Sequence, residues 1–438
     1  MPEIRAFRAL RYDPDRVSRL DLVVAPPYDV ISPALRADLA ARDERNIVHV
    51  DLPAGEPGDK ADERYSRAGR RFAAWQADGT LRRDAVAALY VHEQAFTLPG
   101  AGERRVQRGF YATVRLEPLE AGSGVRPHER TMSGPKEDRL RLMRATGANL
   151  SGVMALYADP AAAAGDLLAE IAATRPASSV LHDGVESRLW VVPEAGATGR
   201  IVAGLREAVE AGPITIADGH HRYETALRYR DERRAAVPAG ADAPFDHVLV
   251  LLLDTASTPP VVLPTHRVAR RLGARVEDLV AAAAALFSVQ PADRAAIAAA
   301  FRAGGSEAGG RGRFGLWTRS GGAILDARRD MFDPWLPDAG PALRRLDVTL
   351  LAVALERLAG IDRDATTAGG RVAYTHSAEE AMAMVDAGAD GADAAFLLEP
   401  TPAAEVAAVA AQGDVMPQKS TFFFPKPLTG LVINPLEP

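Results

Sequence analysis

The densest group of potential ligand-binding residues lies in one short stretch near the middle of the chain. Its members are Asp218, Gly219, His220, His221 and Arg222. An apolar run over residues 213–217 precedes them and a helical spacing of apolar residues follows, so the pattern predicts a strand, a turn and a helix. Free backbone N–H groups and the positive end of the helix dipole then point into the turn, and this geometry binds anions such as the phosphates of a nucleotide.

Two residues of this turn are suited to phosphate. Gly219 permits a positive φ or a close approach of the ligand to the backbone, and Arg222 carries a planar guanidinium that matches phosphate oxygens. The alternative is that the two histidines only cap the helix while Arg222 pairs with Glu224 on a solvated face. The concentration of five such residues in one turn favours the phosphate site.

A second polar group lies in the loop around residues 128–139. Its members are His128, Glu129, Thr131, Lys136, Asp138 and Arg139. The loop also contains glycine and proline, and ligand-binding residues are concentrated on loops that a rigid scaffold positions. We therefore expect substrate contacts here, with a solvated charged loop as the alternative.

Three more segments contain candidate residues. Asp29 lies in a loop before a helix that Ser32 is expected to cap, and His266 and Arg267 follow a proline-rich loop. The last segment contains Lys419, Ser420 and Thr421. Its glycine and lysine invite comparison with a P-loop, but Gln418 departs from that motif, so we expect an anion contact without the nucleotide cradle.

The composition excludes several classes of protein. The 438 residues include 52 Lys and Arg, 58 Asp and Glu and no Cys, which gives a net charge of −6. This balance argues against a nucleic-acid partner, and the lack of Cys excludes disulfides, cysteine-ligated zinc and thiol catalysis. No apolar run is long enough to cross a membrane, and the N-terminus lacks a secretory core. We expect a cytoplasmic protein with a small-molecule substrate and no membrane partner, and the sequence does not predict its oligomeric state.

Hydrophobic periodicity predicts an α/β (α+β) fold. The predicted elements are a hairpin over residues 85–119, strands over 152–157, 246–254 and 394–398, a helix in the alanine-rich stretch 276–289 and a hairpin over 311–329. The length predicts two or three domains. We expect a core over residues 1–272 that contains the phosphate turn, an inserted or appended α/β region over 273–345, and a segment over 346–438 that packs back on the site.

The candidate segments lie far apart in the sequence, so their meeting is itself a prediction. Structural roles would not oblige them to meet, whereas a shared site requires at least three of them around one cavity. We therefore expect the strand at 213–218 to lie inside a sheet and the following helix to begin beside a pocket.

Eight segments together resemble a widespread prokaryotic family designated domain of unknown function 1015. They are APPYDVIS, GFYATVRL, HERTMSGPKEDRL, NLSGVMALY, ADGHHRYETAL, LPTHR, FLLEPT and MPQKSTFFFPKPLTGLVINPL. The phosphate turn in addition resembles the signature of the ParB/sulfiredoxin-like superfamily, which implies a ParB/sulfiredoxin-like mixed core for residues 1–272. The chemistries of that superfamily are reduction of cysteine sulfinic acid, CTP hydrolysis coupled to DNA clamping, and phosphorylation of free L-serine.

The residues of this chain select among the three chemistries. Sulfiredoxins need a cysteine in the turn, where this chain has His220. A DNA clamp needs a helix-turn-helix and a basic face, and the sequence indicates neither. The resemblance therefore implies a kinase that converts free L-serine to O-phosphoserine, with ATP or ADP as the phosphate donor and Mg²⁺ as the cofactor.

The resemblance to free-serine kinases implies the roles of the Asp218–Arg222 turn and of Asp29, and the chemistry of phosphoryl transfer suggests roles for the other residues. Nucleotide phosphates are expected at Asp218, Gly219, His220, His221, Arg222, Lys419, Ser420 and Thr421. Asp29 is the first candidate for the general base and Glu129 the second, while Asp218 is expected near Mg²⁺. Substrate contacts are expected from His128, Thr131, Lys136, Asp138, Arg139, His266 and Arg267.

Two other functions fit the same residues. A metal-dependent hydrolase of a phosphorylated small molecule would bind Zn²⁺ or Mn²⁺ through neutral imidazoles and Asp218. The imidazoles concerned are those of His128, His220, His221 and His266. A non-catalytic nucleotide-binding regulator would use the same turn to bind a nucleotide without consuming it.

Overall fold

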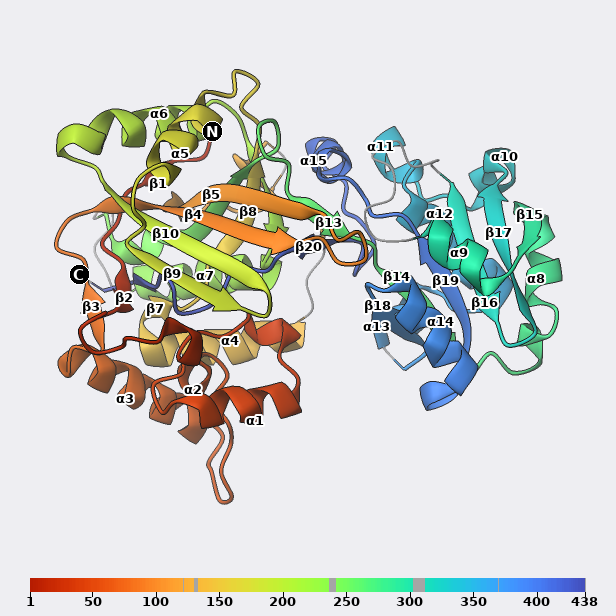
Figure 1. The fold of residues 1–438 in the computed structure, drawn as a ribbon, viewed down its shortest axis with the longest axis horizontal. Helices are drawn as coiled ribbons and strands as arrows, with labels where there is room; N and C mark the ends of the chain where they lie inside the picture. Colours follow the sequence, from red (N-terminus) through yellow and green to blue (C-terminus); the bar gives the residue numbers. More distant parts are fainter. Residues whose placement is uncertain (121, 130–132, 236–241, 302–311, 369, 438) are drawn as a thin grey trace.

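The chain folds into two α/β lobes joined by a pair of short strands, β13 and β20 (Figure 1). The computed structural model describes residues 1–120, 122–129, 133–235, 242–301, 312–368 and 370–437. The α/β class and the additional α/β region in the C-terminal half are both confirmed. Within the described residues, no helix combines the length and the apolar character that crossing a bilayer requires.

In the described part of the chain, the first lobe is built on a nine-stranded mixed sheet. Its strands run in the order β6 (Val125–Arg126), β11 (Ile214–Asp218), β8 (Val153–Tyr157), β12 (His247–Asp254), β5 (Arg104–Arg115), β4 (Ala88–Thr97), β10 (Val185–Pro193) and β9 (Ser178–His182), and β1 (Ile4–Arg5) pairs with β5. The pairs β6–β11 and β8–β12 are parallel, and the others are antiparallel. The predicted hairpin, the strands β8 and β12, and the interior position of β11 are confirmed.

The helices of the first lobe are α1 (Pro33–Arg42), α2 (Val48–Asp51), α3 (Glu63–Ala77), α4 (Ser133–Thr146), α5 (Ala163–Ala172), α6 (Gly199–Glu210) and α7 (His220–Arg234). Helices α4 to α7 cover one face of this sheet, and helices α1 to α3 pack in a separate cluster beside α4. Leu205 of α6 and Tyr223 of α7 pack in one cluster with Leu252 of β12. Ser32 caps α1 as predicted, because its hydroxyl accepts a hydrogen bond from the backbone N–H of Leu35 at 3.2 Å.

The other face of the sheet is covered by the two ends of the chain. Val24 from the N-terminal segment and Phe423 and Val432 from the C-terminal tail pack with Tyr90 and Leu251 of the sheet. Neighbouring residues of β12 therefore belong to clusters on opposite faces. A strand buried on both faces reads as an unbroken apolar run, which is why β12 could be recognised from its sequence.

The second lobe is built on a six-stranded antiparallel sheet of described residues. Its strands run in the order β15 (Phe287–Ala292), β17 (Gly321–Ala327), β16 (Arg313–Thr318), β19 (Ala392–Leu398), β14 (His266–Arg270) and β18 (Val372–Thr375). Its helices are α8 (Leu279–Ala282), α9 (Arg294–Ala300), α10 (Arg329–Phe332), α11 (Pro341–Arg344), α12 (Asp347–Ala354), α13 (Arg363–Ala368), α14 (Ala378–Ala387) and α15 (Ala403–Ala411). The predicted hairpin at 311–329 and strand at 394–398 are confirmed by β16, β17 and β19.

The helix predicted over residues 276–289 is correct only in its middle part, and its last residues form a strand. Only α8 is α-helical there, and a 3-10 turn at Ala283–Ala285 separates it from β15. Phe287 begins that strand by pairing with β17, and its buried ring packs on Phe314 and Phe332. Packing of this aromatic group outweighs the helix propensity of the alanines that precede it.

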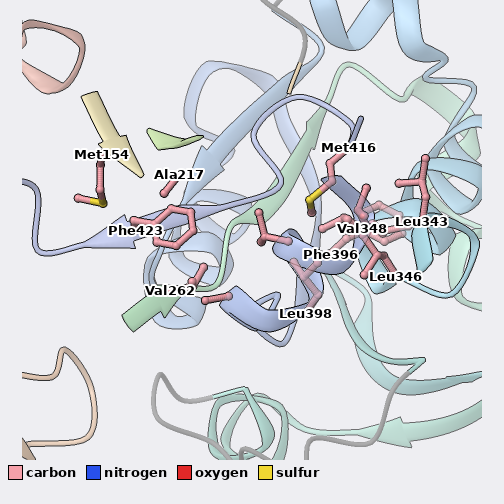
Figure 2. Packing of buried hydrophobic residues seen from close by; sticks show 14 of the residues in the cluster. Met154, Ala217, Val262, Leu343, Leu346, Val348, Phe396, Leu398, Met416 and Phe423 are labelled. Carbon is pink, nitrogen blue, oxygen red and sulfur yellow. The ribbon is translucent and has the colours of Figure 1, made fainter. Parts of the chain in front are cut away.

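The chain leaves the first lobe and returns to it through two strands that pair with each other. β13 (Val261–Leu263) runs antiparallel to β20 (Phe422–Phe424), with Val262 opposite Phe423. Beyond β20, the tail crosses the first lobe, where β21 (Asn434–Pro435) pairs with β7 (Ala148–Asn149). Figure 2 shows the buried cluster running from Met154 beside Phe423 to Phe396 in the second lobe.

This packing predicts that the tail contributes strongly to stability. Phe423 is 1% exposed in the shared cluster, whereas Leu181 on the edge strand β9 is 65% exposed. The substitution Phe423→Ala should lower the free energy of unfolding by about 3–5 kcal/mol, because it removes a buried ring and leaves a cavity. The matched control Leu181→Ala should change it by less than about 0.5 kcal/mol. Urea denaturation followed by tryptophan fluorescence compares the two variants, and equal losses would contradict the prediction.

Candidate functional site

The predicted strand, turn and helix form as β11, Gly219 and α7. Gly219 has a φ of 90°, in the left-handed region that glycine tolerates best. A Cβ placed on it would lie 2.8 Å from Nε of Arg222, so the turn also needs a residue without a side chain. A register shift in β11 before Asp218 places its backbone opposite Met154. Bulges of this kind redirect side chains beside functional sites.

The Asp218 carboxylate is held between two cations. Its Oδ2 accepts a hydrogen bond from Nη2 of Arg222 at 2.6 Å, and its Oδ1 accepts one from Nζ of Lys426 in the C-terminal tail. Burial acts to raise the pKa of Asp218, but Lys426 and Arg222 outweigh it and hold the pKa well below the ordinary value. Arg222 also donates to the carbonyl of Gly152 on the neighbouring segment. Its guanidinium is therefore already engaged by the protein and positions Asp218.

The two buried imidazoles beside this ion pair are neutral. Nδ1 of His128 lies 2.5 Å from the carbonyl of Ile216, which can only accept, so Nδ1 carries the proton and Nε2 accepts from the Thr421 hydroxyl at 3.1 Å. The backbone N–H of His128 donates to Nε2 of His220 at 3.1 Å. Burial lowers the pKa of His128 to about 4 and that of His220 well below its ordinary value. Both rings are therefore held in place by hydrogen bonds within the cluster.

Glu129 is an acidic residue of this cluster whose pKa is raised by burial. Burial raises its pKa to about 7, while Lys419 acts in the opposite direction through its charge and through its backbone N–H, which donates to the carboxylate. The tail holds Glu129 in place, because Met416 pairs with it and donates its backbone N–H to the His128 carbonyl at 2.8 Å. Glu129 therefore exchanges a proton in the pH range where an acid or base catalyst works.

The tail turn at residues 417–421 completes the cluster. Lys419 is exposed and has a φ of 57°, a conformation uncommon for residues other than glycine. Its carbonyl accepts a hydrogen bond from Nη2 of Arg267 at 3.2 Å. Ser420 is buried and donates to the carbonyl of Pro417, so its hydroxyl belongs to the turn itself.

Helix α7 begins without a side-chain cap, which leaves its positive end facing this cluster. His221 in its first turn is half-buried, and burial lowers its pKa. The charges that act on His221 include those of Asp29, Lys136 and Lys419, which come from three different segments. Nζ of Lys136, in α4, lies 2.6 Å from the carboxylate of Glu224, in α7. Asp29 is exposed on the 3-10 turn Tyr28–Val30.

Asp138 and Arg139 lie beside the cluster but are engaged in a network of their own. Arg139 is buried, donates to the carbonyl of Asp51 and to Asp138, each at 2.6 Å, and stacks over the ring of Tyr28 at 4.1 Å. Asp138 also accepts from the hydroxyl of Tyr65 at 2.7 Å. These contacts fasten the N-terminal helices to α4, and the substrate contacts expected from Asp138 and Arg139 stay predictions.

His266 and Arg267 enter from the second lobe. His266 is fully buried, and burial lowers its pKa to about 3. It contacts the backbone N–H of Leu398 and lies in β14, so it does not reach the turn at Gly219. Arg267 meets the cluster only through the Lys419 carbonyl. Thr131, another expected substrate contact, lies outside the described residues.

Contacts bring several of the predicted segments together. His128 hydrogen-bonds to His220 and to Thr421, and Arg267 donates to the Lys419 carbonyl. A small cavity of about 40 Å³ is lined by Tyr28 and Arg222 from two of the segments and by Arg139 of α4, so the meeting of three predicted segments around one cavity stays a prediction. The residue that sequence reasoning missed is Lys426, whose only local signal is a lysine between two prolines. Its partner Asp218 is 208 residues away, and no spacing rule connects positions so far apart.

The described residues contain no group of three or more histidine, aspartate or glutamate side chains arranged to hold a metal ion. The imidazoles of His128 and His220 already use the ring nitrogens described above. The expected Mg²⁺ role of Asp218 does not fit, because each of its carboxylate oxygens accepts from a cation and Mg²⁺ requires free oxygen ligands.

The geometry of the turn yields a test that compares two glycines. Gly79 has a φ of 80°, and a Cβ added to it would meet no atom within 4 Å. Gly219 has a similar φ, but a Cβ added to it would lie 2.8 Å from Nε of Arg222. Gly79→Ala should cost about 1–2 kcal/mol of stability through backbone strain. Gly219→Ala should cost more, because it also displaces Arg222 from Asp218. Thermal and urea denaturation measure both, and a Gly219→Ala loss no larger than that of Gly79→Ala would refute the packing argument.

Comparison with known proteins adds a family but no activity. A conserved hypothetical protein from Pyrococcus furiosus shares 15% identity at a TM-score of 0.33, with 69% of this chain and 90% of that chain covered. A free serine kinase in complex with AMP shares 15% at 0.34, covering 68% and 83%. SbnI from Staphylococcus aureus shares 11% at 0.34, covering 72% and 84%. These similarities are too weak to assign a function.

A search of curated proteins found no match. The family described as "Protein of unknown function (DUF1015)" matches residues 4–349, which is most of the chain. The resemblance that the sequence motifs indicated is thereby confirmed, and this chain belongs to the DUF1015 family.

Proposed function

We propose that this chain is a small-molecule kinase that transfers a phosphoryl group from ATP or ADP to a hydroxyl group, with free L-serine as the acceptor. The observation that supports this proposal best is the position of Glu129. A carboxyl group with a pKa of about 7 lies next to Lys419. The same cluster contains the uncapped start of α7. A proton acceptor and an anion site are thus adjacent.

Phosphoryl transfer asks a protein mainly for positioning and for neutralisation of charge. In this proposal the free N–H groups at the start of α7 and the ammonium of Lys419 bind the phosphates of the donor. Lys136 and the half-buried His221 border the same space. Asp218 and Arg222 do not contact the nucleotide but fix the turn from which α7 begins.

The catalytic step follows from this arrangement. Glu129, when ionised, accepts the proton of the acceptor hydroxyl. At the same time the oxygen of that hydroxyl bonds to the terminal phosphorus of the nucleotide. The bond from that phosphorus to the bridging oxygen breaks, and the shortened nucleotide leaves with the electron pair. Asp29 is the other candidate for the base, and its exposed position on the 3-10 turn places it across from His221. We favour Glu129 because burial raises its pKa to about 7, where a base is effective at neutral pH.

The proposals of L-serine as the acceptor and of Mg²⁺ as the cofactor have less structural support than the proposal of Glu129 as the base. L-serine is proposed from the resemblance of the Asp218–Arg222 turn to that of free-serine kinases, and Mg²⁺ from the general chemistry of nucleotide phosphates. Neither proposal names residues of this chain that bind L-serine or Mg²⁺. The metal-dependent hydrolase has no observation in its favour among the described residues, since no three-ligand group is present.

The direct test is nucleotide consumption. Purified protein is incubated with ATP or ADP, with and without Mg²⁺, and with L-serine, L-threonine or glycerol, and phosphorylated product is measured by mass spectrometry. Formation of O-phosphoserine supports the proposal. Nucleotide binding without consumption in any mixture would instead assign a non-catalytic nucleotide-binding regulator, and absence of binding would dismiss both.

The identity of the base can be tested by two isosteric variants. Glu129→Gln should lower kcat by about 10²–10⁴-fold while leaving nucleotide affinity nearly unchanged, because a general base acts in the transition state. In the wild type, kcat/KM should rise as the pH increases through about 7, since Glu129 must lose its proton to work. That rise should disappear in Glu129→Gln. If Asp29→Asn removes activity and Glu129→Gln does not, the base is Asp29.

The phosphate contact can be tested by a pair of exposed lysines. Lys419→Ala should weaken ATP and ADP binding at least tenfold, since a charged hydrogen bond contributes about 1.5–3 kcal/mol. Lys60 is also exposed but lies in a loop before α3, so Lys60→Ala should leave the affinity unchanged. Isothermal titration calorimetry measures both. An unaltered affinity in Lys419→Ala would remove this residue from the phosphate site.

A further inference from the structure

The second lobe contains a cavity that the proposed kinase reaction does not use. It has a volume of about 500 Å³ and lies between α12, the segment before α11 and the tail at residues 413–418. Apolar side chains form much of its wall, including Leu343, Val348, Val353, Leu355 and Ile361. Pockets that bind small organic molecules have volumes of this order, mostly apolar walls and a few polar groups.

Arg267 is the buried member of the charged groups of described residues that line this cavity; the others, Asp338, Glu356, Asp362, Arg363 and Asp414, are exposed or half-buried. Arg267 is 4% exposed, lies in β14 and donates to the carbonyls of Thr265 and Lys419. Tyr374 lies under its guanidinium at 5.8 Å, and no carboxylate of the described residues forms an ion pair with it. Burial lowers the pKa of Arg267 to about 10, which still leaves it charged at neutral pH. A buried charge without a counter-ion is costly unless a ligand supplies one.

The helix that borders the cavity departs from regular geometry at the same place. Residues Leu355–Ala359 form a π-helical turn that continues α12. Such turns are rare and are often found at functional sites. Leu355 and Glu356 of this turn line the cavity, and Arg357 stacks on Trp335 of the opposite wall at 3.6 Å.

We propose that this cavity binds a small organic anion, a carboxylate on an apolar body, with the carboxylate at Arg267 and the body against the apolar wall. The guanidinium supplies charged donors of the kind that recognise carboxylates. Its volume suits one metabolite-sized molecule. The site is separate from the proposed phosphate site and needs no nucleotide.

The same arginine connects the cavity to the phosphate site. Nη2 of Arg267 holds the carbonyl of Lys419, and Met416, Pro417 and Gln418 line the cavity from the same tail segment. Met416 in turn pairs with Glu129. An anion that engages Arg267 therefore acts on the backbone of Lys419 itself, which makes the cavity a place where a second ligand can adjust nucleotide affinity.

The test uses 8-anilinonaphthalene-1-sulfonate, a fluorescent anion with an apolar body, on the full chain without nucleotide. The wild type should bind it saturably, and 3-phenylpropionate should displace it at least tenfold more effectively than the uncharged 3-phenylpropanol. Arg267→Gln should weaken binding of the probe at least tenfold, and Arg267→Lys should restore part of it. Arg313→Gln is the matched control, because Arg313 is exposed and pairs with Asp326 at the surface.

A second variant protects the test against loss of folding in Arg267→Gln. Ala352 lines the cavity from an exposed position on α12, so Ala352→Phe fills the space without replacing a core side chain. It should abolish displaceable binding while circular dichroism and the melting temperature remain those of the wild type. Binding that is unchanged in Ala352→Phe, or equal competition by the acid and the alcohol, would overturn the proposal. Neither outcome depends on kinase activity or on nucleotide affinity.

Discussion

The buried carboxylate of Asp218, held between Arg222 and Lys426, is the interaction on which the rest of the site depends. It joins the end of strand β11, the first turn of α7 and the C-terminal tail. A carboxylate in this position is stable only while both cations are present, because an unpaired buried charge costs several kcal/mol. The positions of His128, Glu129 and the start of α7 all follow from where these three segments meet.

Much of the fold could be predicted from periodicity. The unbroken apolar run of β12, the hairpin of β4 and β5 and the strand, turn and helix around Gly219 each depend on local residue patterns, and each formed as expected. The exception was the stretch before β15. Alanine has a high helix propensity and no preferred burial, so local sequence could not reveal that the ring of Phe287 pairs with two distant phenylalanines.

The site was harder to predict than the fold for a different reason. Residue types indicated charge and proton chemistry, but they did not indicate which charged side chains would pair with one another. Arg222, which was expected to contact phosphate, forms an ion pair with Asp218, and Arg139, which was expected to contact substrate, donates to the carbonyl of Asp51. Which donor pairs with which acceptor depends on contacts between segments far apart in the chain, such as the one made by Lys426.

The route of the tail has a consequence for how the protein is made. Lys426 follows Asp218 by 208 residues, and the whole second sheet lies between them in the sequence. During synthesis the first lobe can pair most of its strands while the Asp218 carboxylate still lacks its second cation. The ion-paired arrangement therefore forms only after translation has passed Lys426, so a partly made chain lacks the second cation of the Asp218 carboxylate.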